Sequence, residues 1–288
     1  MTQTLHSYKC SKCKDEGYIL WQDKDGHSFY KECDCGIKKK RILQERLKFA
    51  EIPEMYKGCG WKSLRSSVYL NGESKKVFVQ AGKSIRGWYD ALLKMQEVGM
   101  GLYLHSESKG SGKTLAACVL ANEIMENYGK VVKFTTALKI LSEIKATWDG
   151  SGEDEKKLID DLSRAEILII DDFGATSNKD WINDRFYEII NNRYTSRKIT
   201  IFTSNCCISR LNYDERIANR ILERSLEIPF PEESVREHIA EINIKQPHIP
   251  HKAGICDRAV MMRMPPCPNA CAFFAFGYIA VFINICVY

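Results

Sequence analysis

Residues 107–114 read Glu-Ser-Lys-Gly-Ser-Gly-Lys-Thr, and this sequence indicates the fold class more strongly than any other segment. It lies between an apolar run at residues 101–105 and a helical pattern at residues 115–121. A strand, a glycine-rich loop and a helix in this order form a cradle for phosphate groups, because the backbone N–H groups of the loop and the positive end of the helix both point at the anion. The order predicts a nucleotide-binding loop in an α/β fold.

The residues of the loop have separate roles. Gly110 and Gly112, with Ser111 between them, allow the backbone to close around a phosphate group. Lys113 can reach the β- and γ-phosphates, and the hydroxyl of Thr114 can ligate Mg²⁺. We therefore expect these five residues to bind ATP, with Thr114 also holding the magnesium ion.

One position departs from the usual G-x-x-x-x-G-K-S/T pattern, because Glu107 stands where the first glycine belongs. A carboxylate close to the phosphates repels them unless its side chain points away. Taken alone, such a stretch is also compatible with an ordinary turn. The strand before it and the helix after it favour the nucleotide site.

A second strand carries two acids at its end. Residues 165–170 have the composition of a strand buried on both faces of a parallel sheet, and Asp171 and Asp172 follow directly. Open α/β sheets bind ligands at the carboxyl ends of their strands, so we expect Asp171 to hold Mg²⁺ and Asp172 to orient the attacking water. A third strand at residues 199–203 is followed by Asn205 after one residue, which can position this water or sense the γ-phosphate. Taken alone, the two acids could also be helix caps.

Four cysteines form two close pairs near the start of the chain, Cys10 with Cys13 and Cys33 with Cys35. Each pair can place two thiolates on one metal ion, and residues 17–31 between them read as a β-hairpin. Two such pairs joined by a hairpin form a zinc ribbon with tetrahedral coordination by four cysteines. Most of the folding free energy of so small a module would come from the metal.

Other interpretations of this region stay open. His6 or His27 could replace one cysteine as a ligand, although the four cysteines already make a complete set. The four thiols could also be unligated surface groups. Residues 37–47 predict a basic helix that could contact nucleic acid, but basic helix faces are most often merely solvated.

Composition agrees with a soluble protein of the cytoplasm. The chain of 288 residues has room for one α/β domain and a small module, and its net charge of +5 permits nucleic-acid binding without requiring it. Residues 1–9 lack an apolar core segment, so we expect no signal peptide. The remaining cysteines do not form a disulfide framework and are expected to be inert.

Periodicity and turn signals give the organisation of the chain. Alternating strands and helices predict a parallel sheet flanked by helices. Strands are expected near residues 101–105, 131–135, 166–171, 199–204 and 226–230. Helices are expected near residues 73–96, 113–128, 137–147, 154–163, 179–196 and 214–223. The expected parts are a ribbon and basic helix at 1–50, a linker at 51–74, an ATPase domain at 75–245 and an atypical tail at 246–288.

Together, the motifs ESKGSGKT, ILIIDDFG, TIFTSN and ERIANRI resemble those of the AAA+ replicative helicase loaders of the DnaC/DnaI type. The IstB transposition helpers are close relatives of these loaders. The resemblance covers about residues 75–240 and implies an AAA+ P-loop ATPase domain preceded by a small zinc-ribbon domain. IstB helpers usually lack such a ribbon, which favours a loader.

The resemblance also assigns motif roles. Lys113 and Thr114 would belong to Walker A, Asp171 would be the Walker B acid, and Asn205 would be sensor 1. Asp172 stands where the family commonly has a glutamate. Its shorter reach raises the question of whether hydrolysis is efficient.

Three arginines match arginines of the family. Arg220 resembles the finger that reaches the γ-phosphate in a neighbouring subunit, with Arg216 as the second choice. Arg236 resembles the sensor 2 arginine. For each, the alternative is a salt bridge on a helix surface, worth under about 1 kcal/mol.

The function implied by the resemblance is that of an ATPase which delivers a DnaB-type ring helicase onto single-stranded DNA during replication initiation. The subunits would associate through their ATPase domains, and the ribbon would contact the helicase. ATP, Mg²⁺ and Zn²⁺ would be the cofactors. Two alternatives remain, an IstB-like ATPase that assists a transposase and an ATP-binding adaptor without turnover.

The end of the chain does not fit the family. Residues 270–288 carry no charge and are long enough to span a bilayer. A membrane anchor, an out-of-frame extension and a packed soluble segment are all compatible with this composition. No membrane contact is expected unless the tail is a genuine part of the protein.

Overall fold

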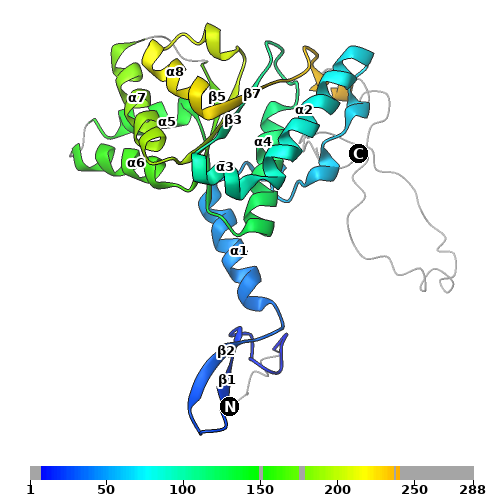
Figure 1. The fold of residues 1–288 in the computed structure, drawn as a ribbon, viewed down its shortest axis with the longest axis vertical. Coiled ribbons are helices and arrows are strands. Elements are labelled where there is room, and N and C mark those ends of the chain that lie inside the picture. The colour runs from blue at the N-terminus through cyan, green and yellow to red at the C-terminus, as the bar shows by residue number, and fades with distance from the viewer. Residues whose placement is uncertain (1–7, 149–151, 175–178, 237, 241–288) are drawn as a thin grey trace, which may run out of the picture.

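The computed structural model describes residues 8–148, 152–174, 179–236 and 238–240 (Figure 1). Among these residues, no helix combines the length and the apolar character needed to cross a membrane. The expectations for His6 and for residues 246–288 lie outside the described residues.

A five-stranded parallel sheet forms the centre of the larger domain, and its strand order is β4-β5-β6-β3-β7. Because all strands are parallel, their carboxyl ends meet at one edge of the sheet, where ligands of open α/β folds bind. The strands are β3 (Gly101–His105), β4 (Val132–Thr136), β5 (Ile167–Phe173), β6 (Ile199–Ser204) and β7 (Ser225–Pro229).

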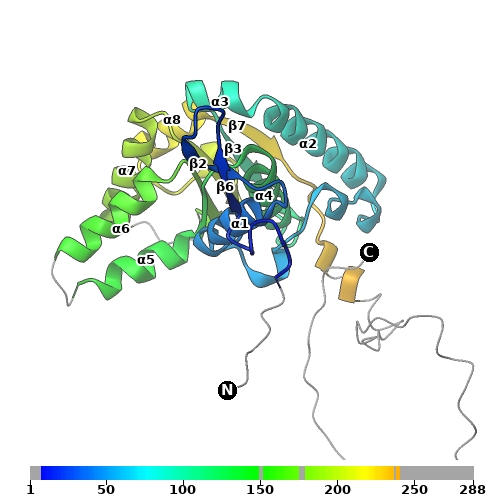
Figure 2. The same ribbon diagram turned by 90° about the horizontal axis from the view of Figure 1, so that it is seen from below.

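Helices cover both faces of the sheet, with α2 and α4 on one side and α5 to α8 on the other (Figures 1 and 2). Alternate residues of β5 enter the two cores: Ile167 and Ile169 pack toward α4, and Leu168 and Ile170 toward α7. The helices of this domain are α2 (Gly72–Asp90), α3 (Leu92–Val98), α4 (Lys113–Glu123), α5 (Ala137–Ala146), α6 (Gly152–Arg164), α7 (Asp180–Thr195) and α8 (Glu215–Arg224).

The predicted alternation of strands and helices is confirmed, with two local differences. The helix expected at residues 73–96 breaks at Ala91, whose φ of −98° and ψ of 14° are not helical, and the break lets Leu92 enter the core fully. The helix expected at 113–128 ends as α4 at Glu123 and continues as a π-helical turn, Ile124–Tyr128. Ile85, Trp88 and Leu92 keep a helical spacing across Ala91, and residues 115–125 are mostly apolar, so periodicity alone does not show such changes of geometry.

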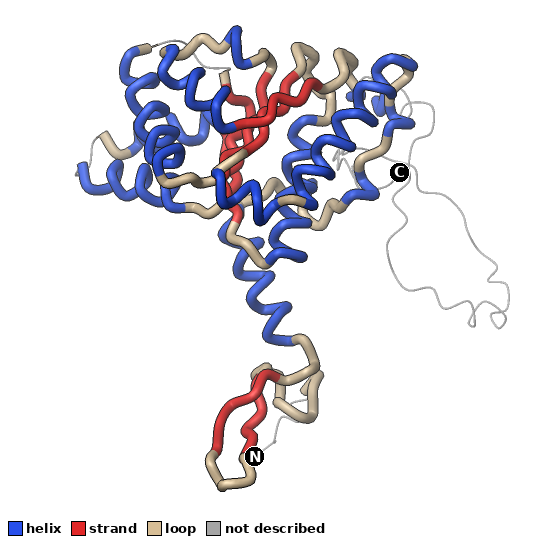
Figure 3. Tube along the Cα trace, in the orientation of Figure 1, coloured by secondary structure: helices blue, strands red, loops and turns tan. Residues whose placement is uncertain are grey.

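The amino-terminal hairpin, β1 (Tyr18–Gln22) and β2 (Ser28–Glu32), lies beyond the far end of helix α1 (Ile37–Ala50) (Figures 1 and 3). Arg41 donates to the carbonyl of Asp15 at 2.9 Å, which ties the hairpin region to the start of α1. The other end of α1 packs on the main core, where Ala50 is fully buried.

The segment expected as a linker, residues 51–74, is packed onto the domain. It contains three short 3₁₀ turns, η1 (Glu54–Tyr56), η2 (Trp61–Ser63) and η3 (Ser66–Val68). Asn122 of α4 donates to the carbonyls of Tyr56 and Cys59 at 2.8 and 2.9 Å. Tyr69 at the end of the segment is buried beside the phosphate loop, residues 107–112.

Candidate functional site

Lys113 lies at the start of α4, directly after the phosphate loop, and is buried. Its ammonium donates to the carbonyls of Ser106 and Ser108 at 3.1 and 3.0 Å and to the hydroxyl of Ser111 at 3.1 Å. Burial lowers the pKa of Lys113, while the charge of Glu232 opposes that shift. The ammonium is therefore held inside the loop, where phosphate oxygens would be bound.

Two positions of the loop require glycine, both for its backbone conformation and for its lack of a side chain. Gly110 and Gly112 have φ angles of 80° and 89°, which L side chains rarely adopt. A Cβ at Gly110 would lie 2.9 Å from Cγ of Arg236, and one at Gly112 would lie 3.1 Å from the hydroxyl of Tyr69. The structure thus places Arg236 directly against the loop.

Thr114 and Asp171 meet across the sheet edge. The hydroxyl of Thr114 donates to Oδ1 of Asp171 at 2.9 Å, and the hydroxyl of Thr203 donates to the same oxygen at 2.5 Å. Burial raises the pKa of Asp171, although both hydroxyl hydrogen bonds oppose that shift. A hydroxyl and a carboxylate are the oxygen ligands that Mg²⁺ prefers, so this pair fits the magnesium ion of a bound nucleotide.

Asp172 and Asn205 lie at the same edge. Asp172 is exposed and has a left-handed φ of 53°, and its backbone N–H donates to the Thr203 hydroxyl at 3.0 Å. Asn205 directly follows β6, the neighbour of β5, and is half-buried. Asp172 thus follows Asp171 on β5 itself, and Asn205 follows the neighbouring strand at the same edge of the sheet.

Glu107 does not stand as an unpaired charge in the loop. Its carboxylate forms an ion pair with Arg210 of the 3₁₀ turn η5 (Ile208–Arg210), which follows β6. Its backbone N–H donates to the carboxylate of Glu232 at 2.9 Å. The side chain that replaces the first glycine is thus neutralised by a cation from another element.

Arg220 and Arg216 lie on α8, away from the phosphate loop of their own chain. Arg220 donates to Asn191 at 2.9 Å and to the Tyr187 hydroxyl at 3.0 Å, both on α7. Arg216 is exposed and pairs with Asp214 at 2.8 Å. Both guanidinium groups lie over the ring of Tyr187, at 4.6 and 4.7 Å from its centre.

The structure brings the four predicted zinc ligands together. The sulfurs of Cys10, Cys13, Cys33 and Cys35 all lie within 4.8 Å of one another, with closest pairs at 3.8 and 3.6 Å. Tetrahedral zinc with Zn–S bonds of about 2.3 Å needs sulfurs about 3.8 Å apart, so the cluster fits this ion. A hydrogen bond from the Cys13 backbone lowers the pKa of Cys10 to about 7, whereas burial and the neighbouring cysteine thiols raise the pKa of Cys35 to about 12. Zinc binding at this cluster would therefore release protons.

His27 stands outside this cluster. Its Nδ1 lies 3.3 Å from the carboxylate of Asp23, near the turn of the hairpin, and the histidine is exposed. The cluster of candidate ligands consists of cysteines alone.

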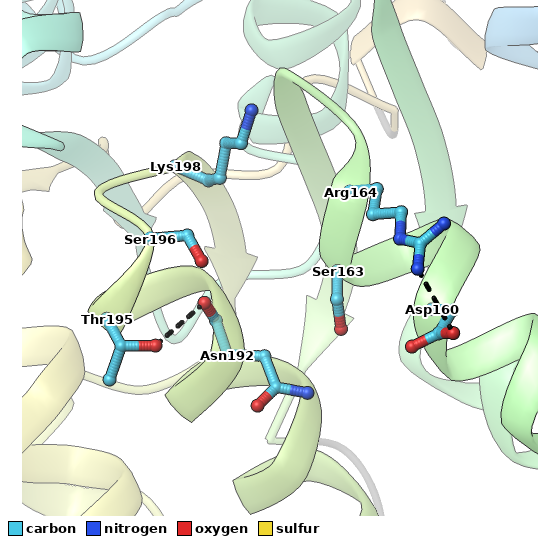
Figure 4. A pocket seen from close by; sticks show the side chains of 7 residues that line it. All are labelled: Asp160, Ser163, Arg164, Asn192, Thr195, Ser196 and Lys198. Atoms are coloured by element: carbon cyan, nitrogen blue, oxygen red, sulfur yellow. Dashed lines mark hydrogen bonds and ion pairs between the residues drawn. The ribbon is translucent and has the colours of Figure 1, made fainter.

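A pocket of about 460 Å³ lies at the opposite edge of the sheet, between the ends of α6 and α7 (Figure 4). It contains none of the residues predicted for nucleotide or metal binding. Its lining consists of Asp160, Ser163, Arg164, Asn192, Thr195, Ser196 and Lys198. The carboxyl ends of two helices meet there, and their partial negative charge disfavours a phosphate ligand.

Four residues at the nucleotide site were not predicted from the sequence: Tyr69, Thr203, Arg210 and Glu232. Thr203 offers one signal, because it is a polar residue at the end of an otherwise apolar buried strand. Tyr69 and Arg210 come from segments without a motif, and Glu232 stands beside the Arg236 motif without being part of it; all three reach the loop only through the fold.

Comparisons with known proteins agree with this geometry. Residues 104–237 match the family described as IstB-like ATP binding protein. Several relatives of the chain are named replicative helicase loader DnaC. One is DnaC of Buchnera aphidicola subsp. Baizongia pistaciae, 26% identical over 78% of this chain and 88% of the loader. Another is DnaC of Escherichia coli, 29% identical over 48% of this chain and 57% of the loader.

A solved structure of DnaI matches the fold with a TM-score of 0.51 at 24% sequence identity, over 62% of this chain and 94% of that chain. The predicted fold, an AAA+ α/β domain with a parallel sheet, and the predicted resemblance to DnaC/DnaI loaders are thus confirmed.

Proposed function

We propose that this protein is an ATPase that loads a ring-shaped replicative helicase onto single-stranded DNA during replication initiation in the cytoplasm. The main observation that supports ATP hydrolysis is the contact between Thr114 and Asp171 beside the buried Lys113. The similarity to helicase loaders over 78% of the chain supports the loading part.

The residues at the carboxyl edge of the sheet would have separate roles in ATP hydrolysis. Lys113 would bind the β- and γ-phosphates, and Thr114 and Asp171 would hold Mg²⁺, which neutralises phosphate charge. Asp172 and Asn205 would orient the water that attacks the γ-phosphate to give ADP and phosphate. Arg236, which lies against Gly110, would contact the nucleotide from the opposite side of the loop.

The amino-terminal hairpin would dock onto the helicase. Leu20 and Tyr30 are 65% and 74% exposed and face each other across the two strands. Such an exposed apolar pair is typical of a protein-binding surface. The four cysteines would bind zinc and keep the hairpin folded.

A pull-down with the purified replicative helicase tests this assignment. We expect the wild type to retain the helicase, and the double variant Leu20→Ser, Tyr30→Ser to lose it while keeping its zinc. Leu138→Ser serves as the control, because Leu138 is equally exposed, at 61%, on α5 of the ATPase domain. Retention by the double variant at wild-type level would rule out docking through this surface.

The name of the matched family also leaves a transposase helper as a second candidate. A loading assay separates the two functions. The proposed loader transfers helicase to single-stranded DNA only with ATP, whereas a transposase helper retains a transposase and leaves helicase loading unchanged. An adaptor without turnover would bind ATP and helicase but release no phosphate.

A further inference from the structure

The chain passes over the phosphate loop after β7. This segment, residues 230–236, is named the strap below. The hydroxyl of Ser106 donates to the carbonyl of Pro231 at 2.9 Å, and the N–H of Val235 donates to the carbonyl of Gly110 at 3.1 Å. The strap therefore contacts the loop near both of its ends.

Glu232 supplies the charged contact between the strap and the loop. Its carboxylate accepts the backbone N–H of Glu107 at 2.9 Å and that of Ser108 at 2.8 Å. The Ser106 hydroxyl lies 3.1 Å from the same carboxylate and shares its one hydrogen between this oxygen and the carbonyl of Pro231. Hydrogen bonds from two amides to one carboxylate are stronger than neutral ones and fix the peptide planes that donate them.

Lys113 binds the same stretch of backbone from the inside of the loop. Its ammonium holds the carbonyls of Ser106 and Ser108, and Glu232 holds the amides of Glu107 and Ser108. The two side chains thus fix residues 106–108 from opposite sides. If Glu232 were removed, these peptides would lose two acceptors and would be free to turn away from Lys113.

We propose that Glu232 is a positioning residue for the nucleotide, which holds residues 106–108 in the conformation in which Lys113 and the loop amides face the phosphates. It stabilises the loop at the place where Glu107 replaces the usual first glycine. This inference rests on the proposed binding of ATP.

Nucleotide affinity of two Glu232 variants tests the proposal. We expect Glu232→Ala to raise the dissociation constant for ATP about ten-fold, because two charge-assisted hydrogen bonds to the loop are lost. Glu232→Gln keeps one acceptor oxygen in place and should recover part of the affinity. Hydrolysis should show a raised KM with kcat nearly unchanged, since Glu232 does not touch the reacting atoms.

A matched control is Glu166→Ala. Glu166 also accepts a backbone N–H, that of Val131 at 2.8 Å, but at the amino end of β5. A general loss of stability would lower the melting temperature of both alanine variants and raise the ATP dissociation constant in neither when measured well below that temperature. The proposal requires the affinity change in Glu232→Ala alone.

Failure of this inference is distinguishable from failure of the proposed function. If the wild type binds no ATP, the proposed function is wrong. If the wild type binds ATP and Glu232→Ala binds it equally well, only the positioning role is wrong. Equal loss in the Gln and Ala variants would show that the charge, rather than an acceptor oxygen at this place, is required.

Discussion

Lys113 is the residue on which nucleotide binding is expected to depend most directly. Its ammonium already lies inside the loop, at 3.0 to 3.1 Å from three oxygens. Lys113→Ala should weaken ATP binding by about 10- to 150-fold, the loss expected when charge-assisted hydrogen bonds worth about 1.5–3 kcal/mol disappear. Calorimetric titration measures this, with Lys94→Ala, an exposed lysine of α3, as the control. Unchanged affinity in Lys113→Ala would contradict the site.

Arg193 is a second residue with a predictable effect, here on stability. It is fully buried and donates to the carbonyls of Leu162, Ala165 and Ile199, and burial lowers its pKa. Arg193→Met should lower the free energy of unfolding by about 3 kcal/mol, because several buried carbonyls lose their donor. Denaturant titration measures the loss, and the exposed Arg164→Ala should change stability by under about 0.5 kcal/mol.

Motif residues could be predicted one by one, but their neighbours could not. The loop motif assigned Thr114 to Mg²⁺ and the strand end assigned Asp171 to the same ion, and in the structure the hydroxyl lies 2.9 Å from the carboxylate. Glu232 accepts a hydrogen bond from Ser108, although the two residues are more than a hundred positions apart in the sequence. No pattern in the strap predicts that contact. Such contacts depend on the order of strands in the sheet, which local periodicity does not contain.

At the level of elements, the cysteine ribbon, residues 8–36, should be a metal-dependent unit. Its hairpin residues are largely exposed, so little apolar burial stabilises it. Purified protein should contain about one equivalent of zinc by metal analysis. Cys10→Ser should lose the zinc and unfold the ribbon while the ATPase domain keeps its melting temperature.

The half-buried Cys207→Ser, outside the ribbon, should keep its zinc and serves as the control. Full zinc retention in a Cys33→Ser, Cys35→Ser double variant would show that other groups are the ligands. Helicase binding should be lost together with the zinc.

Elements with a strong period were predicted closely, and those without one were not. The strands β3 and β6 begin and end near the expected residues because each is a short apolar run with turn signals around it. Residues 51–74 have neither helical nor strand period and read as a linker. In the structure they form short turns that pack on the domain, because single large side chains such as Tyr69 and Ile52 are buried in the core.

At the level of the whole molecule, the contacts of Arg220 bear on where hydrolysis is assembled. This arginine is held by Asn191 and Tyr187 on the surface formed by α7 and α8, and not at the phosphate loop of its own chain. We infer that it acts on a nucleotide bound to a neighbouring subunit. ATPase activity should then rise with protein concentration, and also with single-stranded DNA, which would align subunits through salt-sensitive backbone contacts.

A mixing experiment tests this directly. Arg220→Ala should reduce the turnover of ATP by about 10³–10⁵-fold, the range seen when such an arginine is lost in related phosphoryl transfer, with ATP binding preserved. Mixing Arg220→Ala with Lys113→Ala protein should restore part of the activity, because a subunit with an intact loop can border one with an intact arginine. The parallel mixture with Arg216→Ala decides which of the two arginines over Tyr187 is used. Turnover that is independent of concentration, without rescue in either mixture, would mean that one chain contains the complete site.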